Sequence, residues 1–126
     1  MIYQVKHFHM MFKVNLLKLL EQINGVKIKT REATFEQLKK KDLKETQLLL
    51  GADICFWDEM VDPIYKLVKK SISAGVQQIV IADPGRPPFH EMADKVIDKV
   101  GGEVKEWSVS EEVKASAYLL VVGSLL

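Results

Sequence analysis

Two stretches decide the fold: residues 48–53, Leu-Leu-Leu-Gly-Ala-Asp, and residues 79–88, Ile-Val-Ile-Ala-Asp-Pro-Gly-Arg-Pro-Pro. Each begins with a short, continuous apolar run, which is typical of a strand buried on both faces of a parallel sheet. Each run ends in an aspartate, Asp53 or Asp83. Because ligands of open α/β sheets bind beyond the carboxyl ends of the strands, these two carboxylates are predicted to stand at the functional edge of the sheet.

A helix is expected after each apolar run. The first is predicted to begin with Asp62 at the N-cap and Pro63 at the first helical position, and to end at Gly75. The second follows Pro87-Pro88 and ends at Gly101-Gly102. Their apolar residues recur every three or four positions and are expected to face the core: Ile64, Leu67, Val68, Ile72, Phe89, Met92, Ala93, Val96, Ile97 and Val100.

The segment before the first run also has a periodic pattern. Apolar residues at spacings of three and four, from Val5 to Ile23, predict a helix that ends at Asn24-Gly25. Residues 26–31 alternate apolar and polar side chains, as a half-exposed strand does. The charged residues 36–45 favour a solvated helical turn or loop.

Two further strands are expected near the end of the chain, at residues 103–109 and 117–123. Their connection is too short for a helical crossover, so they should form an antiparallel pair. The whole pattern predicts an α/β fold, with three layers and a mostly parallel sheet that carries an antiparallel C-terminal strand at or near its edge.

Composition excludes several classes of protein. The 126 residues suit one domain, 1–126, and the 18 Lys and Arg are matched by 17 Asp and Glu, so no positive surplus suggests a nucleic-acid partner. A single cysteine excludes an internal disulfide framework, and no metal site is predicted. The longest apolar stretch, 117–126, is shorter than the roughly 20 residues of a membrane span, and no signal peptide is recognised. We therefore expect a cytoplasmic protein.

The residues after the first run suggest a cation site. Phe56 and Trp57 lie beside Asp53 in the stretch Gly-Ala-Asp-Ile-Cys-Phe-Trp. An aromatic face next to a carboxylate suits a cationic ligand, because the ring quadrupole and the anion both attract positive charge. The alternative is structural: Asp53 caps the following turn while the two rings close the core.

The residues after the second run, Asp83-Pro-Gly-Arg86, form a strong turn signal. Arg86 is placed to pair with a substrate carboxylate or with a neighbouring acidic side chain. Two alternatives stay open: a rigid turn that only begins the next helix, and a small anionic ligand held by Arg86 and the helix N-terminus.

These residues are similar to those of a known family. The order of elements resembles the second half of a class I S-adenosylmethionine-dependent methyltransferase, a Rossmann-like fold whose final strand runs antiparallel to the rest. Asp53-Ile-Cys-Phe56 resembles the Asp-x-x-Tyr/Phe motif of the seven-strand protein-lysine methyltransferases. Residues 82–86 are similar to a segment of the branch that methylates the electron-transfer-flavoprotein beta subunit, and Asn15 resembles an Asn in the helix after that fold's second strand.

The resemblance implies methyl transfer from S-adenosylmethionine to a protein lysine. It places Asp53, Phe56 and Trp57 at the transfer site. Asp83 and Arg86 would then contact the substrate. The residues that would bind the cofactor are Glu32, Ala33 and Thr34, together with Asp53. The implied partner is a protein substrate or a complementary methyltransferase subunit.

One feature of the family is missing. Its cofactor loop is rich in glycine, yet none of the seven glycines here forms a Gly-x-Gly after a strand. The chain therefore looks like a methyltransferase domain that is incomplete at its N-terminal side. The alternative function is a non-catalytic remnant of the fold, acting as a partner subunit or interaction module. An exposed sheet edge would favour a homo-oligomer or pairing with another chain.

Overall fold

The computed structural model describes most of the chain. The described residues are 2–5, 8–11, 19, 21–25, 27, 29–31, 33–108, 110–112 and 115–124. The strands within residues 2–11 and 29–31 are described by their backbone alone. Asn15 and Glu32, both singled out by the sequence, lie outside the described residues.

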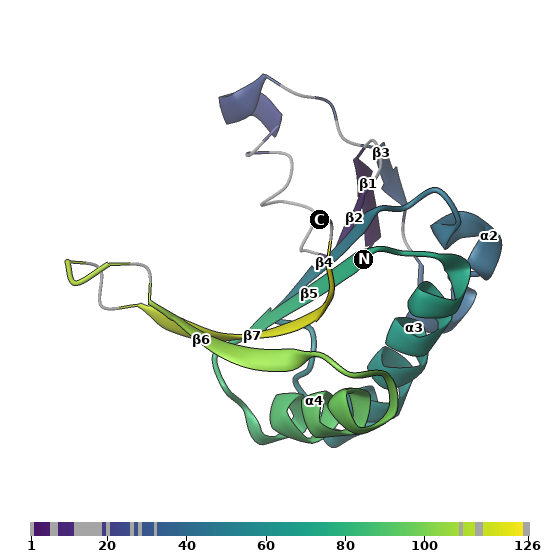
Figure 1. Ribbon diagram of the computed structural model, residues 1–126. Helices are drawn as coiled ribbons and strands as arrows, with labels where there is room; N and C mark the ends of the chain where they lie inside the picture. The colour runs from purple at the N-terminus through teal and green to yellow at the C-terminus, as the bar shows by residue number, and fades with distance from the viewer. Residues whose placement is uncertain are drawn as a thin grey trace.

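The described residues form one seven-stranded sheet with the order β3-β1-β2-β4-β5-β7-β6 (Figure 1). The strands are β1 (Ile2–Val5), β2 (Phe8–Met11), β3 (Lys29–Arg31), β4 (Leu48–Ala52), β5 (Gln78–Asp83), β6 (Glu103–Ser108) and β7 (Ser116–Gly123). Strands β2, β4 and β5 are parallel neighbours. The other four pairings are antiparallel, so the sheet is mixed.

The two long helices cover one face of the sheet and bury the side chains on it. The described helices are η1 (Phe35–Gln37), α2 (Lys40–Leu43), η2 (Asp58–Met60), α3 (Val61–Ala74) and α4 (Pro87–Val100). Figure 1 shows α3 and α4 on the same face of the sheet. Side chains alternate between buried and half-buried along β4 and β5, because only every second residue points toward the helices. The core lies between these two layers and includes Leu49, Ile64, Ile79, Phe89 and Leu120.

Several expectations are confirmed. The structure is α/β, and its last two strands pair antiparallel, with β7 one strand in from the edge. Helix α3 ends at Ala74 and is capped by Gly75, which is left-handed, and α4 begins at Pro87 and ends before Gly101. Residues 21–24 are helical and stop at Gly25, whose φ of +62° is also left-handed. The charged segment near residue 40 forms two short helical turns, η1 and α2.

The helix predicted from Val5 to Ile23 is wrong at its beginning. Val5 ends β1 and Phe8 begins β2, and the two strands form an antiparallel pair. Spacings of three and four also fit two short strands, and pairing with β4, about forty positions away, decides between them. Strand β2 pairs with β4, and β1 and β3 continue the sheet beyond β2. The edge strands of the described sheet are therefore β3 and β6.

Three details also differ from expectation. Helix α3 begins at Val61 rather than after Asp62, because the η2 turn leads directly into it. Ile72, expected to face inward, is 36% exposed. Strands β4 and β5 are fully buried on one face only, so these two strands are less enclosed than a doubly buried strand implies.

The packing of α4 on the sheet predicts a large cost for Phe89→Ala. Phe89 is completely buried, and truncation of such a ring leaves a cavity that costs about 3 to 5 kcal/mol. Urea unfolding measures this loss. Asp94→Ala, an exposed position in the same helix, is the control and should change stability little. Equal stability of the two variants would contradict the packing described for α4.

Candidate functional site

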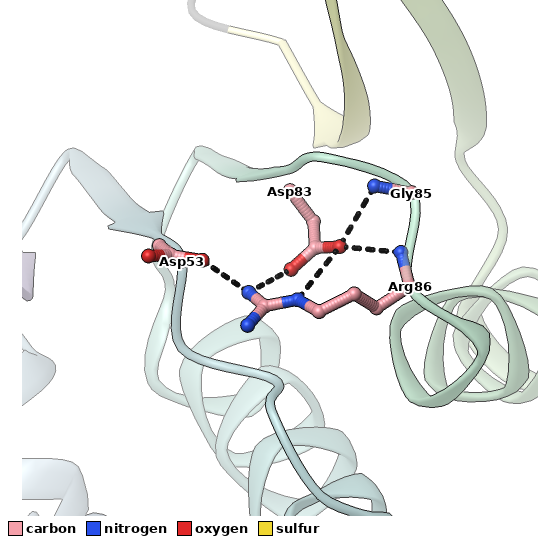
Figure 2. A network of polar contacts seen from close by, with 4 residues as sticks. All are labelled: Asp53, Asp83, Gly85 and Arg86. Atoms are coloured by element: carbon pink, nitrogen blue, oxygen red, sulfur yellow. Dashed lines mark hydrogen bonds and ion pairs between the residues drawn. The ribbon is translucent and has the colours of Figure 1, made fainter.

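The candidate site lies at the carboxyl ends of the neighbouring parallel strands β4 and β5. Asp53 directly follows β4, and Asp83 is the last residue of β5. The backbone N–H of Asp53 donates to the carbonyl of Ala82 at 2.9 Å, which joins the two strand ends. The sequence prediction that both aspartates lie at the same edge is confirmed (Figure 2).

Asp83 is the buried centre of the polar network. Its side chain is 1% exposed, and Oδ2 accepts hydrogen bonds from the backbone N–H groups of Gly85 (2.9 Å) and Arg86 (2.8 Å). Its Oδ1 accepts from Arg86 Nη2 at 2.6 Å. Burial alone raises the pKa of Asp83, but the hydrogen bonds from Arg86 and Gly85 outweigh it, so this pKa lies below its ordinary value. Asp83 is therefore an ionised anchor of the turn.

Arg86 connects the two aspartates. Its Nη2 contacts Oδ1 of Asp53 as well as Oδ1 of Asp83 (Figure 2). Its guanidinium carbon also lies 4.0 Å from the centre of the Phe56 ring, within the range of a cation–π contact. The pairing with an acidic neighbour, one of the two roles predicted for Arg86, is thus present. With both carboxylates in contact, little of its charge is left for an anionic ligand.

Asp53 differs from Asp83 in both exposure and backbone. Its side chain is 57% exposed, and it is the only non-glycine residue with a positive φ (57°) among those described. Aspartate tolerates this left-handed conformation better than most residues, although it still costs about 1 kcal/mol. Such strain at a strand end is a feature of functional sites, and it directs an exposed carboxylate to the open edge of the sheet.

Two residues that support the turn, Tyr118 and His90, are not found by sequence reasoning. A side chain at Gly85, whose φ is +111°, would meet Tyr118 of β7, because an added Cβ would lie 2.7 Å from the Tyr118 ring. The Tyr118 ring in turn contacts His90 of α4 edge to face, with centroids 5.1 Å apart. The Asp-Pro-Gly signal alone identifies the turn. Tyr118, about thirty positions away, can be assigned only from the sheet order.

Cys55, two residues after Asp53, is a buried free thiol, which is typical of a structural cysteine. Burial, together with the negative charge of Asp83, raises its pKa to about 11. The thiol is therefore protonated at neutral pH and is a poor nucleophile.

The other predicted site residues make contacts outside the network around Arg86. Trp57 is 68% exposed, and its carbonyl accepts the Met60 N–H at the start of η2. The backbone N–H of Thr34 donates to Gln37 in its own turn, while Ala33 packs against the core. The structure brings together Asp53, Phe56, Asp83, Gly85 and Arg86, which we call the carboxyl-edge cluster.

The chemistry of the carboxyl-edge cluster favours positively charged ligands. The two carboxylates and one guanidinium leave a formal charge of −1, and the most exposed of these side chains are Asp53 and Phe56. No group of three or more potential metal ligands occurs among the described residues.

Across the same residues, no helix has both the length and the apolar character needed to cross a membrane. The chain matches no known family model and no curated protein.

The Asp83 network predicts a specific loss of stability in acid. Because the pKa of Asp83 is lowered by folding, its ionised form stabilises the protein above about pH 4, the unfolded value. This contribution is lost as the pH falls through the lower folded pKa. Asp83→Asn should cost about 2 to 3 kcal/mol at neutral pH and reduce the acid dependence of the free energy of unfolding.

Urea unfolding between about pH 6 and pH 2 measures both effects. Asp62→Asn is the matched control, because Asp62 also pairs with a cation, Lys95, but is exposed. It should leave neutral-pH stability almost unchanged. A similar loss in both variants would mean that Asp83 has no special place in the fold.

Proposed function

We propose that this chain is a cytoplasmic member of the S-adenosylmethionine-dependent methyltransferase class that transfers a methyl group to a lysine amine of a protein substrate. The observation that carries the proposal is the juxtaposition of Asp53 and Phe56 at the carboxyl end of β4. The two positions match the Asp-x-x-Tyr/Phe motif, and an anion beside a ring suits both an ammonium and a sulfonium.

The sheet topology supports the same proposal. The final strand, β7, runs antiparallel to both of its neighbours, β5 and β6. Strands β4 and β5 are parallel and end at the same edge. This arrangement agrees with the second half of a Rossmann-like methyltransferase fold. A likeness of fold alone would not indicate a reaction, so the proposal depends on the site residues.

Among the described residues, those proposed to lie near the sulfonium of the cofactor have the chemistry that matches it best. The exposed carboxylate of Asp53 and the exposed Phe56 ring offer complementary charge at the open edge of the sheet. Thr34, one of the residues proposed to bind the cofactor, is also exposed and carries a side-chain hydroxyl. When bound, the cofactor supplies an electrophilic methyl group.

The chain's own residues would align and desolvate the acceptor amine. Methyl transfer requires a neutral amine whose lone pair points at the methyl group, so alignment matters more than a strong base. Asp53 would attract the incoming ammonium and orient it. Phe56 and Trp57 are exposed in the chain itself, and a bound protein substrate would cover them and exclude water from that position. Loss of water weakens hydration of the charged amine and favours loss of its proton.

A second candidate function is a non-catalytic subunit. The sequence feature that favours it is the lack of a Gly-x-Gly after any strand, since such a loop lets backbone N–H groups approach a ligand closely. In this case the chain would bind cofactor only in a stoichiometric complex with a methyltransferase that supplies the loop.

The methyltransferase proposal predicts that S-adenosylhomocysteine stabilises the isolated chain. Saturation at a hundred times the dissociation constant adds about 2.7 kcal/mol, which raises the melting temperature of a domain of this size by several degrees. A thermal-shift titration measures this, with calorimetry to obtain the affinity. Asp53→Ala should weaken binding.

The control is Asp62→Ala, which removes another exposed, cation-paired aspartate away from the strand ends. It should bind like the unmodified chain. Absence of any shift would overturn the enzyme proposal for the isolated chain. A defined one-to-one complex with a complete methyltransferase, formed by a chain that shows no shift on its own, would support the second candidate.

A further inference from the structure

The guanidinium of Arg86 lies where a cationic ligand would be expected. It contacts the carboxylate of Asp53 and stacks 4.0 Å from the centre of the Phe56 ring. These two groups form a cation site, defined here as the Asp53 carboxylate and the face of the Phe56 ring. The cation in it belongs to the chain itself.

The contacts of Arg86 differ greatly in strength. On one side it compensates Asp83, which is almost fully buried and also accepts two backbone N–H groups. On the other side it meets Asp53, which is more than half exposed, and the partly exposed ring of Phe56. Loss of the buried contact is costly, whereas exposed ion pairs and exposed cation–π contacts contribute little.

Arg86 therefore has a second arrangement open to it. Its Nε lies 3.5 Å from Oδ2 of Asp83, and its backbone N–H bonds the same oxygen. Rotation about the outer side-chain bonds would move Nη2 away from Asp53 and from Oδ1 of Asp83. The guanidinium would then hold the Asp83 carboxylate through Nε, while the backbone N–H keeps its bond to Oδ2. Because the Arg86 side chain is 26% exposed, water can solvate the released guanidinium.

The geometry points to Arg86 as an internal competitor that determines which cations enter the site formed by Asp53 and Phe56. An external alkylammonium, such as the end of a lysine side chain, displaces the guanidinium from Asp53 and the ring, and Arg86 stays attached to Asp83. The inference deepens the proposed function, on which it rests, because this position is where the acceptor amine would lie.

The test uses n-butylammonium as the probe and follows the Arg86 Nε–H signal of the intact protein by NMR, at constant ionic strength against sodium chloride. The Phe56 ring current shifts this signal while the guanidinium is stacked. Added n-butylammonium should saturably remove that shift. Arg86→Gln removes the competitor and keeps a donor for Asp83, so its affinity for the probe, followed on the backbone amides of 53–57, should rise about tenfold.

Two variants remove the site and keep the Arg86–Asp83 contact: Phe56→Leu and Asp53→Asn. Each should weaken probe binding several-fold, and Phe56→Leu should move the Arg86 signal in the absence of the probe. The control is Asp62→Asn, where Asp62, Lys95 and the Tyr65 ring form a similar trio on α3 and α4. It should leave the Arg86 signal and probe binding unchanged.

The inference is overturned if n-butylammonium leaves the Arg86 signal of the unmodified protein unmoved, or if Phe56→Leu binds the probe as well as the unmodified protein does. These readings remain decisive even where Arg86→Gln fails to fold. They are also separate from the S-adenosylhomocysteine titration. Cofactor binding without displacement of Arg86 would reject this inference alone, and displacement without cofactor binding would reject the methyltransferase proposal alone.

Discussion

The buried carboxylate of Asp83 is the constraint on which the site depends. A charge removed from water must be compensated, and here the partners are Arg86 and the backbone N–H groups of Gly85 and Arg86. This requirement fixes the turn between β5 and α4, and it holds the arginine side chain at the open edge of the sheet. The exposed contacts of Arg86 follow from that placement, because its guanidinium then reaches Asp53 and the ring of Phe56.

The site therefore combines a rigid half and an adaptable half. Asp83, Gly85 and the close packing of Tyr118 set the backbone of the turn. Asp53 and Phe56 are more exposed and present negative charge and an aromatic face to the solvent. Such a division suits a site that recognises a cation, since the ligand contacts change without disturbing the fold. The proposed methyl transfer and the proposed displacement of Arg86 both depend on this division.

Sequence reasoning placed Asp53 and Asp83 at the same edge of the sheet but did not give the contacts between the residues there. Strands β4 and β5 and helix α4 were predictable because continuous apolar runs and Pro or Gly punctuation are local signals. The strands β1 and β2 were missed, since their short apolar spacing also fits a helix and only pairing with β4 distinguishes the two. The contact of Arg86 with Asp53, 33 positions away, and its stacking on Phe56 require the folded sheet. Burial on one face of β4 is likewise a tertiary property.

The most direct test of the central claim is to map where S-adenosylhomocysteine binds, by following backbone amide shifts during an NMR titration. If the carboxyl ends of β4 and β5 form the functional site, the largest changes fall on residues 53–57 and 83–86, and the outer surface of α3 and α4 is unaffected. Changes centred on that helical surface, or no saturable changes anywhere, would contradict the assignment of this edge as the ligand site of a methyltransferase.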